Sequence, residues 1–294
     1  MNYFPFKYEE PLFRPPSEAY SLILQITGGC SWNECAFCEM YSSKTFKIKP
    51  FELVKKEIES VSGFRFNKVF LADGDAMVLS ANKLLKILRE IKNKLPGVRR
   101  ISIYARPSDF LKKSAEELKE LKSAGLDLAY VGIESGDDEV LKNVNKGETS
   151  NTTLEGLLKA KDAGIKLSVM ILNGLGGKEL TVQHAVNSAV LLNKLQPEFL
   201  STLVLSFPYG EEHFKKRYAG NFTALNKLEL INEIGILLQH TELKQTVFRS
   251  DHASNYLVLK GILSKDKENL LNKINFVLQN PDKANLREEY MRGL

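Results

Sequence analysis

The chain has 294 residues, of which 43% are hydrophobic and 26% charged, and its formal net charge at pH 7 is +5. This length provides a sizeable core for one large domain or two ordinary ones. No apolar run approaches the roughly 20 residues of a membrane-spanning helix, and the N-terminus lacks the order of a signal peptide. We therefore expect a cytoplasmic protein with no membrane partner, whose charge permits nucleic-acid binding without indicating it.

Residues 1–19 are rich in proline and aromatic side chains, which favours an extended segment over a helix. From Tyr20 onward, short runs of β-type apolar residues alternate with longer helical patterns, which is typical of βα units around a parallel sheet. The expected strands lie at about 20–27, 68–73, 100–105, 127–133, 166–172 and 199–206. The expected helices lie at about 51–62, 81–95, 114–124, 151–163 and 179–195.

Six strands are too few for a closed eight-fold barrel. We expect an α/β fold built as a partial, six-stranded (β/α)6 TIM-like barrel, or alternatively a doubly wound sheet, with its site at the carboxyl ends of the strands. After Pro208 the pattern changes to helices at about 223–240 and 266–280 around a short apolar piece. We therefore divide the chain into an N-terminal extended segment (1–19), the partial barrel (20–210) and a mainly helical C-terminal extension (211–294), expected to form a lid or substrate region.

All three cysteines of the chain, Cys30, Cys35 and Cys38, follow the first expected strand within nine residues. Thiolates are soft ligands that favour zinc or an iron–sulfur cluster. Three thiolates leave one iron of a [4Fe–4S] cluster open to a substrate or cofactor, whereas a structural zinc site needs four ligands and no histidine is near in sequence. Buried structural thiols and a disulfide set are the alternatives, although this clustering is unlike a secreted disulfide scaffold.

The segment from Cys30 to Cys38 resembles the cluster loop of the radical S-adenosylmethionine (SAM) superfamily. In that family three cysteines hold a [4Fe–4S] cluster, and the amino and carboxylate groups of SAM chelate the fourth iron. Phe37 matches the aromatic residue before the last cysteine, and the two-residue gap between Cys35 and Cys38 matches the usual spacing. Four residues, in place of the usual three, separate Cys30 from Cys35.

Polar residues also follow the second and third expected strands. Asp73, Gly74 and Asp75 stand in the place of the family's Gly-Gly-Glu-type motif, and the resemblance implies that they accept hydrogen bonds from the amino group of SAM. The alternative is an ordinary βα turn in which an aspartate caps a helix. Arg106 could pair with the carboxylate of SAM, and its alternative role is a surface salt bridge.

The stretch from Val131 to Gly147 resembles one shared by oxygen-independent coproporphyrinogen oxidases and tRNA-modifying radical SAM enzymes. It places Glu134 and Ser135 at the end of the fourth expected strand, where the family's glutamate contacts ribose hydroxyl groups. Asn173 begins a glycine-rich turn at the end of the fifth strand, which could admit the adenine or ribose of SAM. The turn is not a phosphate loop, because the Lys-Ser/Thr ending is absent.

The segment from Phe248 to Tyr256 is the most unusual polar cluster outside the expected barrel. Its density of hydrogen-bonding groups favours a lid or substrate contact, with Arg249 and His252 as the candidate catalytic residues. The alternative is a polar loop that docks the C-terminal helices onto the barrel. The other histidines occur singly in helical patterns, and we expect surface or core positions for them: His184, His213 and His240.

Together these resemblances imply a radical SAM enzyme, an oxidoreductase or transferase, that reductively cleaves SAM at a [4Fe–4S] cluster to a 5′-deoxyadenosyl radical acting on an unidentified substrate. The implied partners are an electron donor such as flavodoxin or ferredoxin and a small-molecule substrate, which is favoured over RNA. A tRNA-modifying radical SAM enzyme is the alternative within the family, and a non-catalytic iron–sulfur or electron-transfer protein is the alternative from another class. With three cysteines only, a second cluster, as in methylthiotransferases, would need ligands from a partner.

Overall fold

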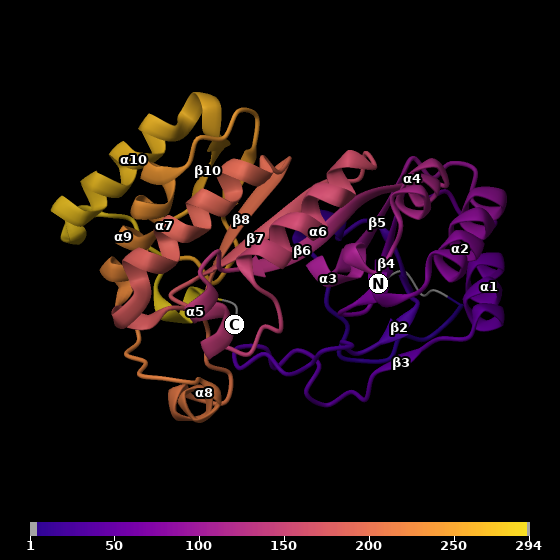
Figure 1. The fold of residues 1–294 in the computed structure, drawn as a ribbon, viewed down its shortest axis with the longest axis horizontal. Coiled ribbons are helices and arrows are strands. Elements are labelled where there is room, and N and C mark those ends of the chain that lie inside the picture. The colour runs from indigo at the N-terminus through magenta and orange to yellow at the C-terminus, as the bar shows by residue number, and fades with distance from the viewer. Residues whose placement is uncertain (1–4, 293–294) are drawn as a thin grey trace. The chain divides into compact units, whose positions relative to one another are not determined.

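The structure is a computed structural model that describes residues 5–292 (Figure 1). Its main sheet is mostly parallel and has eight strands in the order β1-β4-β5-β6-β7-β8-β9-β10, and a second sheet pairs β2 with β3. The fold is therefore α/β, as expected. The six strands expected from the sequence are all present: β1 (Leu22–Gln25), β4 (Lys68–Ala72), β5 (Arg100–Ala105), β6 (Leu126–Glu134), β7 (Lys166–Asn173) and β8 (Phe199–Val204).

The chain forms two compact units that do not follow one another along the sequence. We call unit 1 the described residues up to 33 together with 38–131 and 155–167, and unit 2 residues 34–37, 132–154 and 168 onward. The Cys30 to Cys38 segment therefore contributes residues to both units. The expected division at residues 19 and 210 stays a prediction.

Parallel strands that are apolar on both faces form the core of unit 1. Leu24 of β1 pairs with Leu71 of β4, and Val69 of β4 pairs with Ile101 of β5. Four of the five residues of β4 are buried, as expected for a parallel sheet covered by helices. Unit 1 contains the helices α1 (Phe51–Ser60), α2 (Ala81–Lys94), α3 (Pro107–Leu111) and α4 (Ala115–Ser123), and the short strands β2 (Thr27–Gly28) and β3 (Lys47–Ile48).

In unit 2, β8 pairs in parallel with both β7 and β9, and β10 closes this part of the sheet in antiparallel pairing with β9. Helix α9 packs beside both α7 and α10 (Figure 1). Asn226 begins α9 with a capping box that uses Glu229 three residues later. The helices of unit 2 are α5 (Asp138–Asn143), α7 (Gly177–Leu195), α8 (Glu211–Arg217), α9 (Lys227–His240) and α10 (Leu263–Gln279), and α6 (Ser150–Asp162) has residues in both units.

The C-terminal region differs from the expectation in one respect. Two strands, β9 (Val247–Ser250) and β10 (Leu259–Ile262), extend the main sheet beyond six strands. The interpretation of 248–256 as a loop was therefore wrong for its first three residues, which belong to β9. Phe248 and Ser250 are buried whereas Arg249 is exposed, so this short strand alternates inward and outward side chains despite its polar composition.

The remaining segments are short or irregular. Helices α3, α5 and α8 were not predicted, because five to seven residues are too few for a clear helical period. Residues 5–15 contain neither helix nor strand, a single 3₁₀ turn covers Pro16–Glu18, and residues 1–4 of the expected extended segment lie outside the described residues. Within residues 5–292, no helix is both long and apolar enough to cross a membrane.

Candidate active site

The three cysteines are partly exposed and form no disulfide in the described residues. Cys30 and Cys38 belong to unit 1, and Cys35 belongs to unit 2. No three Cys, His, Asp or Glu side chains within residues 5–292 are gathered as a metal site. The fit to an iron–sulfur cluster rests instead on the donor set, since three closely spaced thiols without a nearby histidine suit soft cluster iron better than a four-ligand zinc site.

Asn33 lies in the four-residue gap between Cys30 and Cys35. Its backbone has a left-handed φ of 52°, which asparagine adopts more readily than most residues. Its side-chain amide donates a 3.1 Å hydrogen bond to the carbonyl of Tyr41. In the same gap, Ser31 donates a hydrogen bond to Asp75, and the Trp32 ring lies 4.9 Å from the guanidinium carbon of Arg106. The longer gap is therefore an ordered part of the loop.

The middle of the cysteine loop packs into unit 2. Ala36 belongs to an apolar cluster with Val140, Val144 and Leu175, and Phe37 packs against the same cluster. The Ala36 amide also donates a 2.8 Å hydrogen bond to the carbonyl of Val144. These contacts hold residues 36 and 37 against α5 and the turn that follows it.

Two further side chains bind the backbone of this loop. The Arg217 guanidinium, at the end of α8, donates a 2.9 Å hydrogen bond to the carbonyl of Cys35. The side-chain amide of Asn145 donates a 3.3 Å hydrogen bond to the carbonyl of Glu34. Unit 2 thus fixes the backbone on both sides of Cys35.

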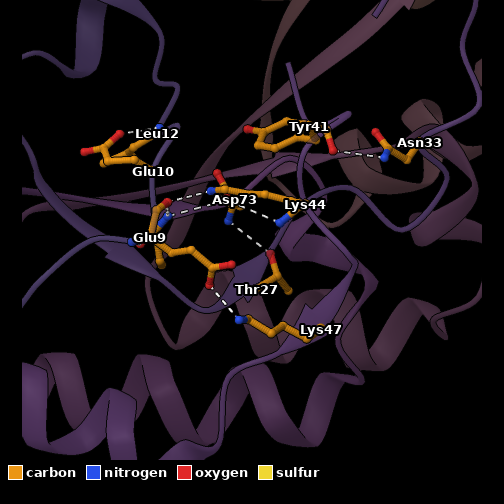
Figure 2. A network of polar contacts seen from close by, with 11 residues as sticks. Glu9, Glu10, Leu12, Thr27, Asn33, Tyr41, Lys44, Lys47 and Asp73 are labelled. Carbon is orange, nitrogen blue, oxygen red and sulfur yellow. Dashed lines mark hydrogen bonds and ion pairs between the residues drawn. The ribbon is translucent and has the colours of Figure 1, made fainter. Parts of the chain in front are cut away.

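Asp73 is fully buried, and its carboxylate is engaged by the protein (Figure 2). Its Oδ2 accepts hydrogen bonds from Nζ of Lys44 at 2.7 Å and from the amide of Gly29 at 3.3 Å. Lys44 also donates to the carbonyl of Glu9 at 2.6 Å, and Oγ1 of Thr27 accepts from the Asp73 amide at 3.0 Å. Burial raises the pKa of Asp73, and the hydrogen bond and the charge of Lys44 partly oppose this increase. The protein therefore engages Oδ2 of Asp73, whereas the buried Oδ1 has no hydrogen-bond partner within residues 5–292.

Gly74 lies directly against the ring of Tyr41. A Cβ atom at this position would collide with three ring carbons, so only glycine fits without displacing Tyr41. An aromatic ring of the protein itself therefore occupies the space on the Cβ side of Gly74.

Asp75, Arg106 and Asp109 form the second polar group of unit 1. Asp75 and Asp109 are both fully buried, and one oxygen of each, Oδ1, has no hydrogen-bond partner within residues 5–292. Burial, followed by the neighbouring Asp109, raises the pKa of Asp75 well above the usual range of a carboxyl group. The Arg106 amide donates to Oδ2 of Asp109 at 2.9 Å, which places Arg106 at the start of α3. Buried acceptors without partners are typical of a ligand site.

Glu134 is the corresponding acid of unit 2. Only 4% of its surface is exposed, and its φ of 68° is left-handed, which is uncommon for a residue with a long side chain. Its Oε1 lies 3.2 Å from Nζ of Lys146, and its Oε2 is buried without a hydrogen-bond partner in the described residues. The sequence identified Glu134 but gave no indication of its pairing with Lys146, twelve positions later.

Ser135 and Asn173 are engaged by other residues of unit 2. The Ser135 hydroxyl lies 2.8 Å from Nδ1 of His184 and accepts a 3.0 Å hydrogen bond from the Asp137 amide. The Asn173 side-chain amide donates to the carbonyl of Leu230 at 2.9 Å. Both side chains are buried, so their contacts fix the ends of β6 and β7.

Arg249 and His252 lie in and after β9. Arg249 is exposed and donates a 2.8 Å hydrogen bond to the carbonyl of Phe248. His252 is half-buried, and its Nδ1 bonds to the hydroxyl of Ser254 at 2.9 Å. Burial, followed by the charge of Arg287, lowers the pKa of His252. Within the described residues, neither side chain hydrogen-bonds to Glu134.

Sequence reasoning missed several residues that complete these polar groups, because most of their contacts join positions far apart in the sequence. The one local signal was the turn pattern at 145–147, where Asn145 and Gly147 both have left-handed φ angles. The missed residues are Lys44, Asp109, Lys146, His184, Arg217 and Glu233.

Comparison with known proteins gives several related matches. A provisionally assigned methylthiotransferase of Methanocaldococcus jannaschii is 23% identical over 234 residues, covering 73% of this chain and 51% of that protein. The heme chaperone HemW of Bacillus subtilis is 26% identical over 130 residues, covering 42% of this chain and 34% of HemW. The chain thus spans about half, or less, of the length of these curated relatives.

A solved structure shares the fold. Coproporphyrinogen III oxidase (HemN) from Escherichia coli, a radical SAM enzyme, superposes with a TM-score of 0.58 over 75% of this chain and 52% of that chain, at 17% sequence identity. The model of the radical SAM superfamily, whose members are enzymes that use a [4Fe–4S] cluster and SAM, matches residues 24–189. Because this match covers more than half of the chain, the chain belongs to the radical SAM superfamily.

Proposed function

We propose that this chain reductively cleaves SAM at one [4Fe–4S] cluster held by Cys30, Cys35 and Cys38. When bound, the cluster and SAM together supply a 5′-deoxyadenosyl radical that abstracts hydrogen from a substrate. The observation that carries the proposal for this chain is Glu134, a buried carboxylate at a strand end with one oxygen that has no partner within residues 5–292. Such an oxygen suits a ligand hydroxyl group.

The contacts support different roles for the candidate SAM residues. Asp75 and Arg106 would bind the amino and carboxylate groups of SAM, because Asp75 has a buried acceptor without a partner and Arg106 carries a permanent charge. Glu134 would accept hydrogen bonds from the ribose. Asp73 and Ser135 would position the neighbouring backbone, because Lys44 and His184 already engage their side chains.

The three remaining candidates would act by packing against the cluster loop or by fixing the conformation of a turn. Phe37 would shield the cluster loop from water, since it packs against the apolar cluster of unit 2. Gly74 and Asn173 would hold the turns after β4 and β7 in the shape that SAM requires, the first against Tyr41 and the second through Leu230.

Arg249 and His252 are proposed to contact the substrate. Exposure of Arg249 and the half-buried position of His252 leave both available to a small molecule. Changing either to alanine should leave cluster content and SAM binding intact and should abolish acceleration of 5′-deoxyadenosine formation by the substrate. The same proposal includes an electron donor such as flavodoxin or ferredoxin. It also includes a cytoplasmic location, which keeps the thiols reduced.

The experiment is to reconstitute the protein anaerobically, reduce it with dithionite, add SAM and separate the nucleoside products by chromatography. Slow formation of 5′-deoxyadenosine without substrate is expected, and Cys35→Ala should abolish it. Methylthioadenosine or S-adenosylhomocysteine as the sole product would instead indicate a polar, non-radical use of SAM.

The relative from Methanocaldococcus jannaschii favours a second candidate, sulfur transfer, because its match covers 73% of this chain. The 294 residues contain only three cysteines, so a second cluster would need ligands from elsewhere. About four irons per chain would agree with a single cluster and about eight would favour this second candidate. RNA retained through anaerobic purification would favour a tRNA substrate.

A further inference from the structure

The ammonium group of Lys146 lies close to two groups that the proposed function uses. Its Nζ is 3.2 Å from Oε1 of Glu134 and 5.7 Å from the centroid of the Phe37 ring. Lys146 is 8% exposed and Glu134 is 4% exposed, so the ion pair is largely removed from water. Removing one partner of such a pair leaves a buried charge without compensation, which is costly.

The backbone around the pair is shaped to hold it. A Cβ atom at Gly132 would collide with the Glu134 carboxylate and would lie 3.5 Å from Nζ of Lys146. Glu134 has a φ of 68°, and the residues on either side of Lys146, Asn145 and Gly147, have φ values of 51° and 72°. A left-handed φ is ordinary for glycine and frequent for asparagine, but it is uncommon for glutamate. Uncommon conformations such as that of Glu134 are often found at binding sites.

The residues just before Lys146 hold the cysteine loop. The Val144 carbonyl accepts a 2.8 Å hydrogen bond from the Ala36 amide, and the Asn145 side chain donates a 3.3 Å hydrogen bond to the Glu34 carbonyl. Residues 144–146 therefore contact the loop at three consecutive positions, and the last of them also contacts Glu134. No other side chain among the described residues forms an ion pair with Glu134.

We propose that Lys146 is a positioning residue that orients Glu134 for the ribose of SAM and ties this carboxylate to the Glu34 to Phe37 part of the cysteine loop. The inference rests on the proposed function. Lys146 occupies Oε1 of Glu134, whereas Oε2 is buried without a hydrogen-bond partner within residues 5–292. One oxygen is thus held by the protein, and the other is left for a ligand hydroxyl group.

The test measures binding of S-adenosylhomocysteine, which carries the same nucleoside and is not cleaved, to the cluster-loaded protein by anaerobic equilibrium dialysis. Lys146→Met should raise the Kd about tenfold, because the orientation and charge compensation of Glu134 are lost. Lys142→Met, an exposed position on α5, is the matched control and should change the Kd by less than about twofold. Iron content should be normal in both variants.

A double-mutant cycle separates positioning from a general structural role. If Lys146 acts through Glu134, then Lys146→Met should add little to the loss caused by Glu134→Gln. Strictly additive losses, or an unchanged Kd in Lys146→Met, would overturn the assignment. These experiments measure binding and not the cleavage of SAM. A wild-type protein that forms no 5′-deoxyadenosine would contradict the proposed function, but the Kd values would still test the role of Lys146.

Should Lys146→Met fail to fold, Lys146→Arg retains the charge while moving the donor atoms. The wild-type preference for S-adenosylhomocysteine over its 2′-deoxy analogue should then shrink, since the ribose hydroxyl is the group that Glu134 would bind. An unchanged preference in Lys146→Arg, with weaker binding of both ligands, would show that Lys146 acts elsewhere and would overturn the proposal.

Discussion

The hydroxyl oxygen of Ser135 lies 2.8 Å from Nδ1 of His184, and both side chains are buried. On the other side of the imidazole, Nε2 is 3.8 Å from Oε1 of Glu233, which in turn accepts a 2.6 Å hydrogen bond from the Gly174 amide. A line of polar groups therefore joins the end of β6 to the turn after β7 within unit 2. It explains why His184, which has no expected ligand role, is a core residue.

Replacing His184 with leucine should lower the free energy of unfolding by about 1 to 3 kcal/mol, because buried polar groups on Ser135 and Glu233 lose a partner. Urea denaturation followed by circular dichroism under anaerobic conditions measures this. The matched control is His213→Leu at an exposed position of α8, for which a change below about 0.5 kcal/mol is expected. Equal stability of the two variants would show that the contacts of His184 contribute nothing.

Single alanine substitutions of Cys30, Cys35 and Cys38 should each reduce the iron bound after anaerobic reconstitution below about four per chain. The physical reason is that no other thiol of the chain can replace a lost ligand. Ser42→Ala, at an exposed site beyond the last cysteine, is the control and should retain its iron. If any of the three cysteine variants keeps its full iron content, that cysteine is not a ligand.

The alternation of strands and helices was predictable because it depends on local periodicity and on turn residues. The six expected strands, the α/β class and the radical SAM family are all confirmed. The strand β9 was missed because only four residues form it and two of them, Arg249 and Ser250, are polar. The roles assigned to the cysteines and to the SAM and substrate residues stay predictions.

Pairings between distant residues could not be read from the sequence. Glu134 was identified from its place at a strand end, but its contact with Lys146 depends on the left-handed turn after α5. Ser135 was expected to bind the cofactor, and only the packing of α7 shows that His184 meets its hydroxyl. Local patterns identify which residue types stand at strand ends, whereas tertiary packing decides which of their atoms remain available.

Glu134→Ala and Asp75→Ala should each weaken SAM binding by about 1 to 3 kcal/mol, the usual cost of losing a charge-assisted hydrogen bond. Iron content should stay normal, since neither residue is expected to bind the cluster. Equilibrium dialysis with SAM, alongside an iron assay, measures both quantities. Glu139→Ala, on the exposed face of α5, should behave as wild type. Loss of iron together with SAM binding would show that the residue is structural.

The last prediction concerns how stability depends on pH. Burial, and then the neighbouring Asp109, raises the pKa of Asp75 above its unfolded value of about 4. A carboxyl group with a raised pKa binds more protons in the folded state, so its stabilising contribution is present at low pH and is lost as the pH rises through the raised pKa. Asp75→Asn removes this titration.

Relative to Asp75→Asn, the wild-type protein should therefore become progressively less stable as the pH rises from about 5 to 8, which thermal unfolding at a series of pH values measures. Asp127 provides a control of opposite sign. Burial alone would raise the pKa of Asp127, but its hydrogen bond with Lys122 at 2.6 Å and the charge of that lysine lower it. The stabilising contribution of Asp127 should thus be present at neutral pH and lost on acidification. The difference in stability between the wild-type protein and Asp127→Asn should therefore become smaller as the pH falls. If the wild-type and Asp75→Asn curves run parallel, then Asp75 is not held with a raised pKa in the folded protein.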